Sequence, residues 1–169
     1  ADHRVQVDPR AGRVRLWDED AEVAAFRPPM PGDHNAMNAA AAAILARWLG
    51  VPWDAAAGSL EGFAGLERRM SRLGMRPLAG GGEVVVYDDY GHHPTEVDAT
   101  LRALRAAESP RRLVCVFQPH QHSRTRFLLE EFAAAFSSAD VVIVPEIYFV
   151  RDSEVERTRV SAADLVDRL

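Results

Sequence analysis

The chain has 169 residues, of which 47% are hydrophobic and 27% charged, and its net charge is −5 at pH 7. This composition is typical of a globular protein, and the sequence contains no apolar run long enough to cross a membrane. We therefore expect neither a nucleic acid nor a membrane as a partner. Cys115 is the single cysteine of the sequence, which excludes a disulfide framework and fits a reducing cytoplasm. It lies in an apolar run, so we expect a buried thiol.

All 20 basic residues are arginine, and the sequence contains no lysine. Neither a P-loop lysine nor a Schiff-base lysine can therefore come from these 169 residues. The first ten residues lack the basic and apolar regions of a secretory signal, so export is not expected.

Residues 3–27 alternate between apolar and polar positions in short runs, separated by the turn signals DPRAG and DED. This pattern predicts short antiparallel strands. The prolines of the following RPPMPG segment predict an irregular connection, because proline has no N–H to donate to a regular ladder.

An alanine-rich segment over residues 34–50 has apolar residues at helical spacing and ends at Gly50 and Pro52. It predicts a helix, for which Asp33 is the expected N-cap. A second short helix is predicted from about residue 53. The glycine-rich and charged segment that follows is typical of a linker, and we place a hinge at residues 69–82.

From residue 83 the sequence alternates between apolar strand patterns and helical patterns. Strands are predicted at 83–90, 112–119 and 140–148, and helices at 95–107, at 124–137 and from about Ser161. Continuously apolar strands separated by helices indicate a parallel sheet that is buried on both faces. The predicted fold class is α/β: a Rossmann-like parallel sheet with helices on both faces, preceded by a partial α/β remnant with short strands and two helices. We expect the sequence to be truncated at both ends.

Two polar loops follow the first two predicted parallel strands, DDYGHHPTE at 88–96 and QPHQHSRTR at 118–126. Loops at the carboxyl ends of parallel strands meet at one edge of the sheet, where ligands bind. We read Thr95 and Asp98 as a capping box for the next helix. The candidate site residues that remain are Asp88, Asp89, Tyr90, His92 and His93 in the first loop, and His120, His122, Arg124 and Arg126 in the second.

The two loops allow more than one chemistry. The second loop contains no acidic residue, so its arginines are expected to be free to bind a carboxylate or phosphate. Alternatively, the aspartates and histidines could hold the metal ions of a metal-dependent hydrolase. Each residue alone could also be a solvated or hydrogen-bonded structural residue.

Two further groups lie upstream. Asn35 and Asn38 are three residues apart, so their amides share one helix face, and amides that donate and accept suit a nucleobase edge. Arg68 and Arg69 lie at the expected hinge, where domain movement could bring an arginine to a phosphate. A solvated basic turn is the alternative.

Four stretches together resemble the Mur ligase family, which builds the peptidoglycan precursor: PGDHNAMNAAAA, FAGLERRM, DDYGHHPTE and QPHQHSRT, in this order over residues 31–126. The resemblance implies that residues 1–68 are the end of the central ATP-binding domain and that 83–169 are part of the C-terminal Rossmann-like domain. It also implies that the P-loop and the Mg²⁺ ligands lie outside this chain, and that the chain alone is inactive.

The last two stretches are typical of the branch that adds L-alanine to UDP-N-acetylmuramate in cytoplasmic cell-wall synthesis, which supports cell shape and cell division. In that reaction ATP activates the muramoyl carboxylate to an acyl phosphate, which the amine of L-alanine attacks. By resemblance, the ATP-binding residues are His34, Asn35, Asn38, Arg68, Arg69 and Asp89. The substrate-binding residues are Tyr90, His92, His120 and Arg124, with His92 and Arg124 as the catalytic pair.

The sequence departs from the family pattern at Gln121, where a basic residue is expected, at His122, where an aromatic one is usual, and at Met70, where phenylalanine is usual. A related ligase that recycles a muropeptide tripeptide and a non-catalytic nucleotide-binding module remain as alternatives.

Overall fold

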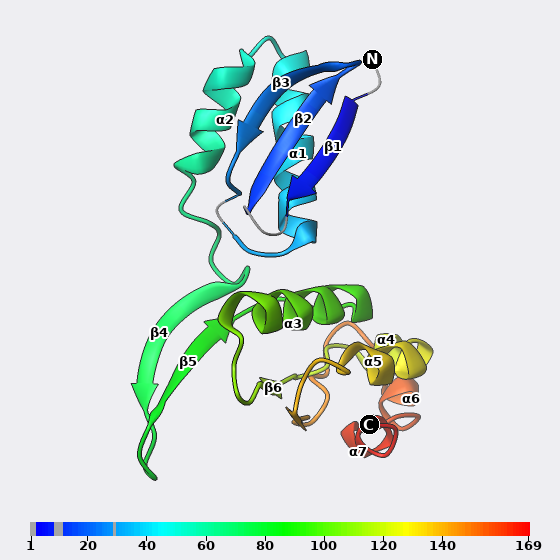
Figure 1. The fold of residues 1–169 in the computed structure, drawn as a ribbon. Coiled ribbons are helices and arrows are strands. Elements are labelled where there is room, and N and C mark those ends of the chain that lie inside the picture. The colour runs from blue at the N-terminus through cyan, green and yellow to red at the C-terminus, as the bar shows by residue number, and fades with distance from the viewer. Residues whose placement is uncertain (1–2, 9–11, 29) are drawn as a thin grey trace. The chain divides into compact units, whose positions relative to one another are not determined.

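The computed structural model describes residues 3–8, 12–28 and 30–169. The chain divides into two compact units, Ala1–Asp89 and Tyr90–Leu169, and each is described by itself (Figure 1). Antiparallel sheets and one parallel strand pair occur together with helices, so the chain is a mixed α/β protein, as the sequence predicts. Within the described ranges, no helix is both long and apolar enough to span a membrane.

The first unit begins with an antiparallel meander of β1 (His3–Asp8), β2 (Arg13–Asp18) and β3 (Ala21–Phe26). Val14, Leu16 and Phe26 are fully buried, and Arg13 and Arg15, which alternate with Val14 and Leu16 along β2, are exposed. This alternation places one face of the sheet against the core. The short antiparallel strands predicted from the alternating pattern are confirmed.

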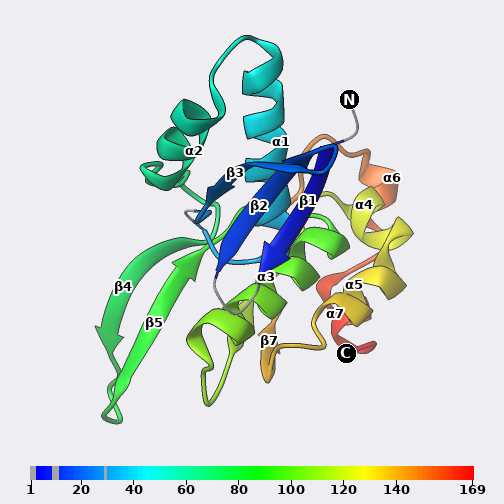
Figure 2. The same ribbon diagram turned by 45° about the horizontal axis from the view of Figure 1, so that its top comes forward.

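Two helices, α1 (Asp33–Trp48) and α2 (Trp53–Glu61), pack on this meander (Figure 2). The buried side of α1 consists of alanines, which allow a close approach to Val14, Leu16 and Phe26. The expected N-cap at Asp33 was wrong, because Gly32 occupies that position with a φ of 100° and Asp33 lies in the first helical turn. There its carboxylate faces the positive end of the helix dipole.

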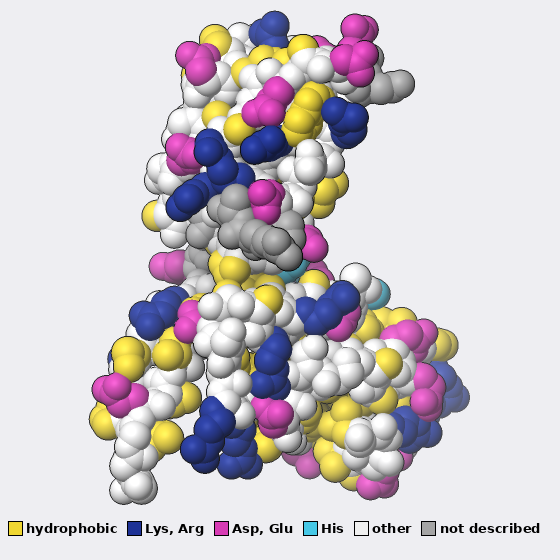
Figure 3. Space-filling model, viewed as in Figure 1, with side chains coloured by type: hydrophobic (Ala, Val, Ile, Leu, Met, Phe, Trp, Pro, Cys, Tyr) yellow, Lys and Arg dark blue, Asp and Glu magenta, His cyan; other side chains and the backbone are white. Residues whose placement is uncertain are grey.

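The expected hinge at residues 69–82 contains a strand, β4 (Ser71–Pro77), which pairs antiparallel with β5 (Glu83–Asp88). The glycine-rich stretch closes this hairpin: Gly81 and Gly82 have positive φ, and the Leu78 N–H donates to the Gly82 carbonyl at 3.0 Å. The prediction of a linker was therefore wrong at β4. The strand that pairs with residues 83–88 is therefore antiparallel to them, whereas we expected these residues to belong to a parallel sheet. Apolar side chains are exposed along the hairpin (Figure 3), namely Leu73, Met75, Leu78 and Val84.

The second unit begins with α3 (Pro94–Glu108), close to the predicted 95–107. It continues with β6 (Val114–Val116), α4 (His122–Phe127), α5 (Leu129–Ala135), β7 (Val141–Ile143), α6 (Glu154–Arg157) and α7 (Ala162–Val166). β6 and β7 are parallel, as predicted. Their core is formed with α3, α5 and α7 by Val97, Leu101, Phe117, Phe132, Phe136 and Leu165.

Two details of this unit differ from the prediction. The single helix expected at 124–137 is interrupted at Leu128, which separates α4 from α5. The parallel pair is covered on one face only, because Val114, Val116 and Ile143 are exposed whereas Cys115 packs against the core. Cys115 is half-buried rather than fully buried as the sequence suggested, and desolvation raises the pKa of its thiol to about 11.

Candidate functional site

In the first unit, Met70 connects the start of α1 to the end of β5. The Asn35 Nδ2 donates to the Pro31 carbonyl at 2.8 Å and lies 3.4 Å from the Met70 Sδ. The Met70 N–H donates to the Asp89 Oδ2 at 2.8 Å, and the Met70 side chain is buried. Two of the candidate ATP-binding residues, Asn35 and Asp89, are therefore brought together through one buried methionine.

The two arginines beside Met70 lie on an exposed turn. Arg68 has a φ of 57° and Met70 a φ of 46°, both in the left-handed region that favours glycine. The Arg68 Nε lies 3.9 Å from the Asp88 Oδ2, while Asp89 holds the Met70 amide. The turn thus exposes both guanidinium groups on a backbone that is fixed by the end of β5. His34 and Asn38 lie on the first two turns of α1, where His34 is half-buried and Asn38 is exposed.

In the second unit, Tyr90 and His92 are in contact, with their ring centroids 5.4 Å apart in an edge-on arrangement. The His92 Nδ1 lies 3.2 Å from the Tyr90 carbonyl oxygen and 3.4 Å from the Glu96 Oε2. Because two oxygen acceptors face this nitrogen, we assign its proton to Nδ1. The lone pair of the neutral ring is then on Nε2, which can accept a proton.

His93 forms the N-cap of α3. Its Nδ1 accepts the Thr95 N–H at 3.3 Å, while the Glu96 Oε2 accepts the N–H groups of His92 and His93 at 2.9 and 3.2 Å. The expected capping box of Thr95 and Asp98 was therefore wrong by two residues, and Asp98 pairs instead with Arg102. His93 has a structural role, since its ring nitrogen is used to cap the helix.

The second polar loop is attached to the segment that follows β7. The Tyr148 N–H donates to the Pro119 carbonyl at 2.8 Å, and the Gln121 N–H donates to the Tyr148 carbonyl at 3.1 Å. His120 lies in a parallel bridge with Tyr148, and their ring centroids are 5.2 Å apart. The loops after β6 and β7 therefore extend the parallel pairing beyond the strands, so that their side chains meet at one edge.

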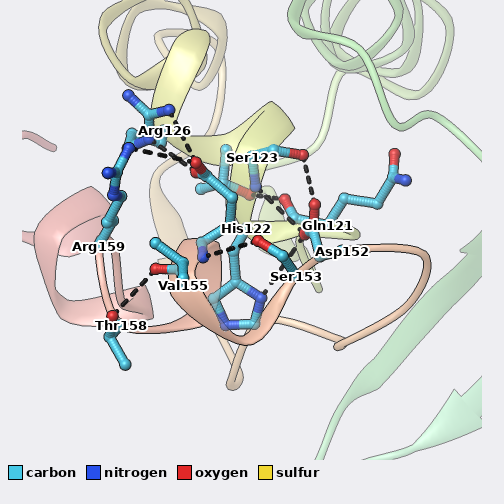
Figure 4. Close-up of polar contacts among 11 residues, drawn as sticks. Gln121, His122, Ser123, Arg126, Asp152, Ser153, Val155, Thr158 and Arg159 are labelled. Atoms are coloured by element: carbon cyan, nitrogen blue, oxygen red, sulfur yellow. Dashed lines mark hydrogen bonds and ion pairs between the residues drawn. The ribbon is translucent and has the colours of Figure 1, made fainter.

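The start of α4 is shown in Figure 4. Gln121 has a φ of 69°, and its carbonyl accepts the Thr125 N–H at 3.1 Å and the Thr125 Oγ–H at 2.9 Å. His122 is buried edge-on against Phe149, with its Nδ1 3.9 Å from Asp152. We expected His122 among the site residues, but its burial places it in the packing behind the loop.

The two arginines of α4 differ in their contacts. Arg126 forms a bidentate pair with Glu156, at 2.9 Å from Nε and 3.2 Å from Nη2. This pair lowers the pKa of the Glu156 carboxyl below its usual value. Arg124 is half-buried, and its guanidinium has no hydrogen bond or ion pair with any described residue. The expectation that both arginines are free was therefore wrong for Arg126, whereas the Arg124 guanidinium could bind a ligand.

A metal site requires several convergent donors. The described parts of the chain contain no group of three or more His, Cys, Asp or Glu side chains that could hold a metal ion. The metal-hydrolase alternative therefore has no site in these ranges.

A family model described as "Mur ligase, glutamate ligase domain" matches residues 68–169. The chain belongs to the Mur ligase family. The match includes both polar loops and both arginines of the exposed turn.

Named relatives and solved structures agree with this family. The chain is 49% identical over 119 residues to a UDP-N-acetylmuramate–L-alanine ligase of Stenotrophomonas maltophilia, covering 70% of this chain and 25% of that protein. It is 46% identical over 151 residues to the enzyme of the same name from Halorhodospira halophila, covering 88% and 31%. The crystal structure of UDP-N-acetylmuramate-alanine ligase MurC from Thermotoga maritima matches with a TM-score of 0.68 at 26% identity, covering 92% of this chain and 32% of that one. A murein peptide ligase from Psychrobacter arcticus matches with a TM-score of 0.60 at 25% identity, covering 85% and 30%.

The Mur ligase chain thus spans between a quarter and a third of the length of these relatives. Sequence reasoning did not single out Ser123, Tyr148 and Asp152, which connect the two loops of the second unit. The available signal was their position, because the loop after β7 lies at the same edge of the parallel pair as the loop after β6.

Proposed function

We propose that this chain is part of an ATP-dependent ligase that joins L-alanine to the carboxylate of UDP-N-acetylmuramate. The observation that supports it best is half-buried Arg124 in the first turn of α4, four residues after His120, because its guanidinium is unpaired within the described ranges. A guanidinium binds a carboxylate through two parallel hydrogen bonds, as an amino-acid substrate requires. The relatives that carry the name of this activity are 46% and 49% identical to the chain.

In the proposed reaction, the muramoyl carboxylate attacks the terminal phosphorus of ATP, and ADP leaves. The amine of L-alanine then attacks the carbonyl carbon of the acyl phosphate, and inorganic phosphate leaves as the amide forms. The ammonium form of L-alanine has no lone pair, so it must lose a proton before the attack. His92 is the proposed acceptor of this proton at Nε2, since its Nδ1 faces the Tyr90 carbonyl and Glu96.

The proposed ligand contacts of the other residues divide between the two units. Tyr90, His92, His120 and Arg124 are the proposed L-alanine and product contacts, and all lie in the second unit. His34, Asn35, Asn38, Arg68, Arg69 and Asp89 are the proposed ATP contacts, and all lie in the first unit. In this proposal, amino-acid binding and nucleotide binding are separate tasks of the two units.

Some parts of the reaction need groups that these residues do not provide. The sequence has no lysine, so a lysine that binds the ATP phosphates would lie outside these 169 residues. The family resemblance implies Mg²⁺, but the described residues contain no suitable group of metal ligands, and we derive no step through a metal ion. The reaction is proposed to take place in the cytoplasm as a step of peptidoglycan synthesis, with consequences for cell shape and division.

The test uses the whole gene product with ATP, UDP-N-acetylmuramate and L-alanine. We expect release of ADP and phosphate only when all three are present, together with a product whose mass corresponds to the muramoyl-alanine amide. The 169-residue chain alone is expected to be inactive. Turnover with a peptide in place of L-alanine would instead support the activity named for the Psychrobacter arcticus relative.

A further inference from the structure

The first turn of α4 has no cap from its own N-cap residue. Gln121 occupies the N-cap position, and its side chain makes no capping hydrogen bond. The first N–H groups of a helix have no partner within the helix and need an acceptor from elsewhere. In this helix the acceptor is Asp152, in the loop between β7 and α6: one carboxylate oxygen accepts the Ser123 N–H at 3.2 Å, and the other accepts the Ser123 Oγ–H at 2.5 Å (Figure 4).

Asp152 is a buried anion. Its side chain is only 4% exposed. A carboxylate in such a position is costly unless hydrogen bonds replace its lost water. Burial raises the pKa of Asp152, but the hydrogen bonds from Ser123 and from the His122 N–H together outweigh this effect and hold the pKa below its usual value. The loop thus keeps a charged carboxylate beneath the start of α4.

The residues proposed to bind L-alanine lie on both sides of this contact. Arg124 follows Ser123 directly, and His120 lies three residues before Ser123 in a bridge with Tyr148. Gln121, between them, has a φ of 69°, which a side chain other than glycine adopts only when its surroundings hold it there. The direction of the Arg124 side chain therefore depends on the bonds that fix the first turn of α4.

We propose that Asp152 is a positioning residue: through Ser123 it fixes the start of α4 and so directs the Arg124 guanidinium toward the carboxylate of the amino-acid substrate. This inference rests on the proposed function. A nucleophilic triad of Ser123, His122 and Asp152 does not fit the same atoms. Ser123 donates directly to the carboxylate, and the His122 ring does not lie between them, as a base that activates a serine must.

The chain contains a matched control for this contact. At α7, Ser161 donates its N–H and its Oγ–H to the Asp164 Oδ2 at 2.7 and 2.8 Å. Here too, a serine donates its N–H and its hydroxyl to an aspartate carboxylate at the start of a helix. This position is exposed, and it lies outside the two strand-end loops. Asp152→Asn and Asp164→Asn remove the same charge from the same kind of bond.

The experiment measures steady-state kinetics of the whole gene product and of its Asp152→Asn, Ser123→Ala and Asp164→Asn variants. For Asp152→Asn we expect the KM for L-alanine to rise about 10-fold to 100-fold, because a small displacement of a substrate-binding group is enough for such a loss. The KM for ATP should stay within about twofold in this variant, and Asp164→Asn should change neither constant. Ser123→Ala keeps the backbone bond and is expected to fall between the two.

Hydrogen exchange of the segment 118–126, measured by mass spectrometry on the same proteins, gives a readout independent of activity. Faster exchange in Asp152→Asn than in Asp164→Asn is expected. The inference is overturned if both variants change the kinetics equally, or if Asp152→Asn raises the KM of ATP as much as that of L-alanine. If the unmodified protein forms no amide with L-alanine, the proposed function fails, and unchanged exchange in Asp152→Asn would separately show that Asp152 does not fix the loop.

Discussion

The Asp89 Oδ2 accepts a 2.8 Å hydrogen bond from the Met70 N–H, and this bond joins the end of β5 to the turn that contains Arg68 and Arg69. The turn needs such support, because Arg68 and Met70 both adopt positive φ values. Residues other than glycine in this region carry a strain of about 1–3 kcal/mol. A carboxylate that binds the Met70 amide directly offsets part of that strain.

Asp89→Ala is expected to destabilise the first unit by about 1–2 kcal/mol, because it leaves the Met70 N–H without this acceptor. Urea unfolding followed by tryptophan fluorescence reports on this unit alone, since Trp17, Trp48 and Trp53 all lie within it. Asp88→Ala is the control, because its 3.9 Å pair with Arg68 is largely exposed and is expected to contribute less than about 1 kcal/mol. Equal losses in the two variants would contradict the role of Asp89.

The first unit shows which parts of the fold the sequence could predict. The meander and both helices were predictable, because alternation along β1–β3 and the alanine-rich pattern of α1 each match one regular structure. β4 was not, because Gly74 has a φ of 102° and the register with β5 shifts between Arg72 and Gly74, so the strand lacks a clear alternation. A segment rich in glycine and arginine is also typical of a linker, so the sequence did not distinguish a linker from β4.

Asp140 should make the second unit sensitive to acid. The Leu113 N–H and the Arg105 guanidinium both donate to its carboxylate at 2.7 Å, and these bonds lower its pKa. Since the pKa is lower in the folded state, the stabilisation is present above the unfolded pKa, near 4, and is lost as the pH falls through the folded value. Thermal unfolding should therefore show a steeper loss of stability below about pH 4 for the unmodified chain than for Asp140→Asn. Parallel curves for the two proteins would refute this assignment.

His122→Phe is expected to stabilise the second unit by about 1 kcal/mol, because the buried Nδ1 of His122 has no hydrogen-bond partner among the described residues. A phenyl ring of similar shape keeps the edge-on contact with Phe149. Labelling of the half-buried Cys115 thiol during denaturation measures the opening of this unit, since the cysteine packs in its core. A loss of stability would indicate that the contact of the imidazole with Asp152, at 3.9 Å, outweighs the unpaired nitrogen.

The sequence placed the candidate site between the loops at 88–96 and 118–126, which were expected at one edge of a parallel sheet. The structure joins a different pair, the loops after β6 and β7, and β5 pairs antiparallel with β4. The spacing of the histidines in the sequence does not reveal which of them have structural roles. His93 caps α3 through local bonds to Thr95 and Glu96, whereas His122 is buried against Phe149, a tertiary contact that the spacing does not show. The convergence of His92 and Arg124 on one substrate remains a prediction.

Arg124 and Arg126 provide the sharpest test of the proposed substrate pocket, because they lie on the same short helix and Arg126 is paired with Glu156, whereas Arg124 has no partner among the residues that the structure describes. Arg124→Ala in the whole gene product should raise the KM for L-alanine about 10-fold to 100-fold, the effect of losing charge-assisted hydrogen bonds of about 1.5–3 kcal/mol. The KM for ATP should change far less.

Two further variants serve as controls for Arg124→Ala. Arg124→Lys is expected to recover part of the lost affinity for L-alanine, because lysine keeps the charge but cannot form the bidentate pair. Arg126→Ala removes the same group from the same helix and should lower stability while leaving the ratio of the two KM values unchanged. Equal rises for L-alanine and ATP in Arg124→Ala would place this arginine outside the amino-acid pocket.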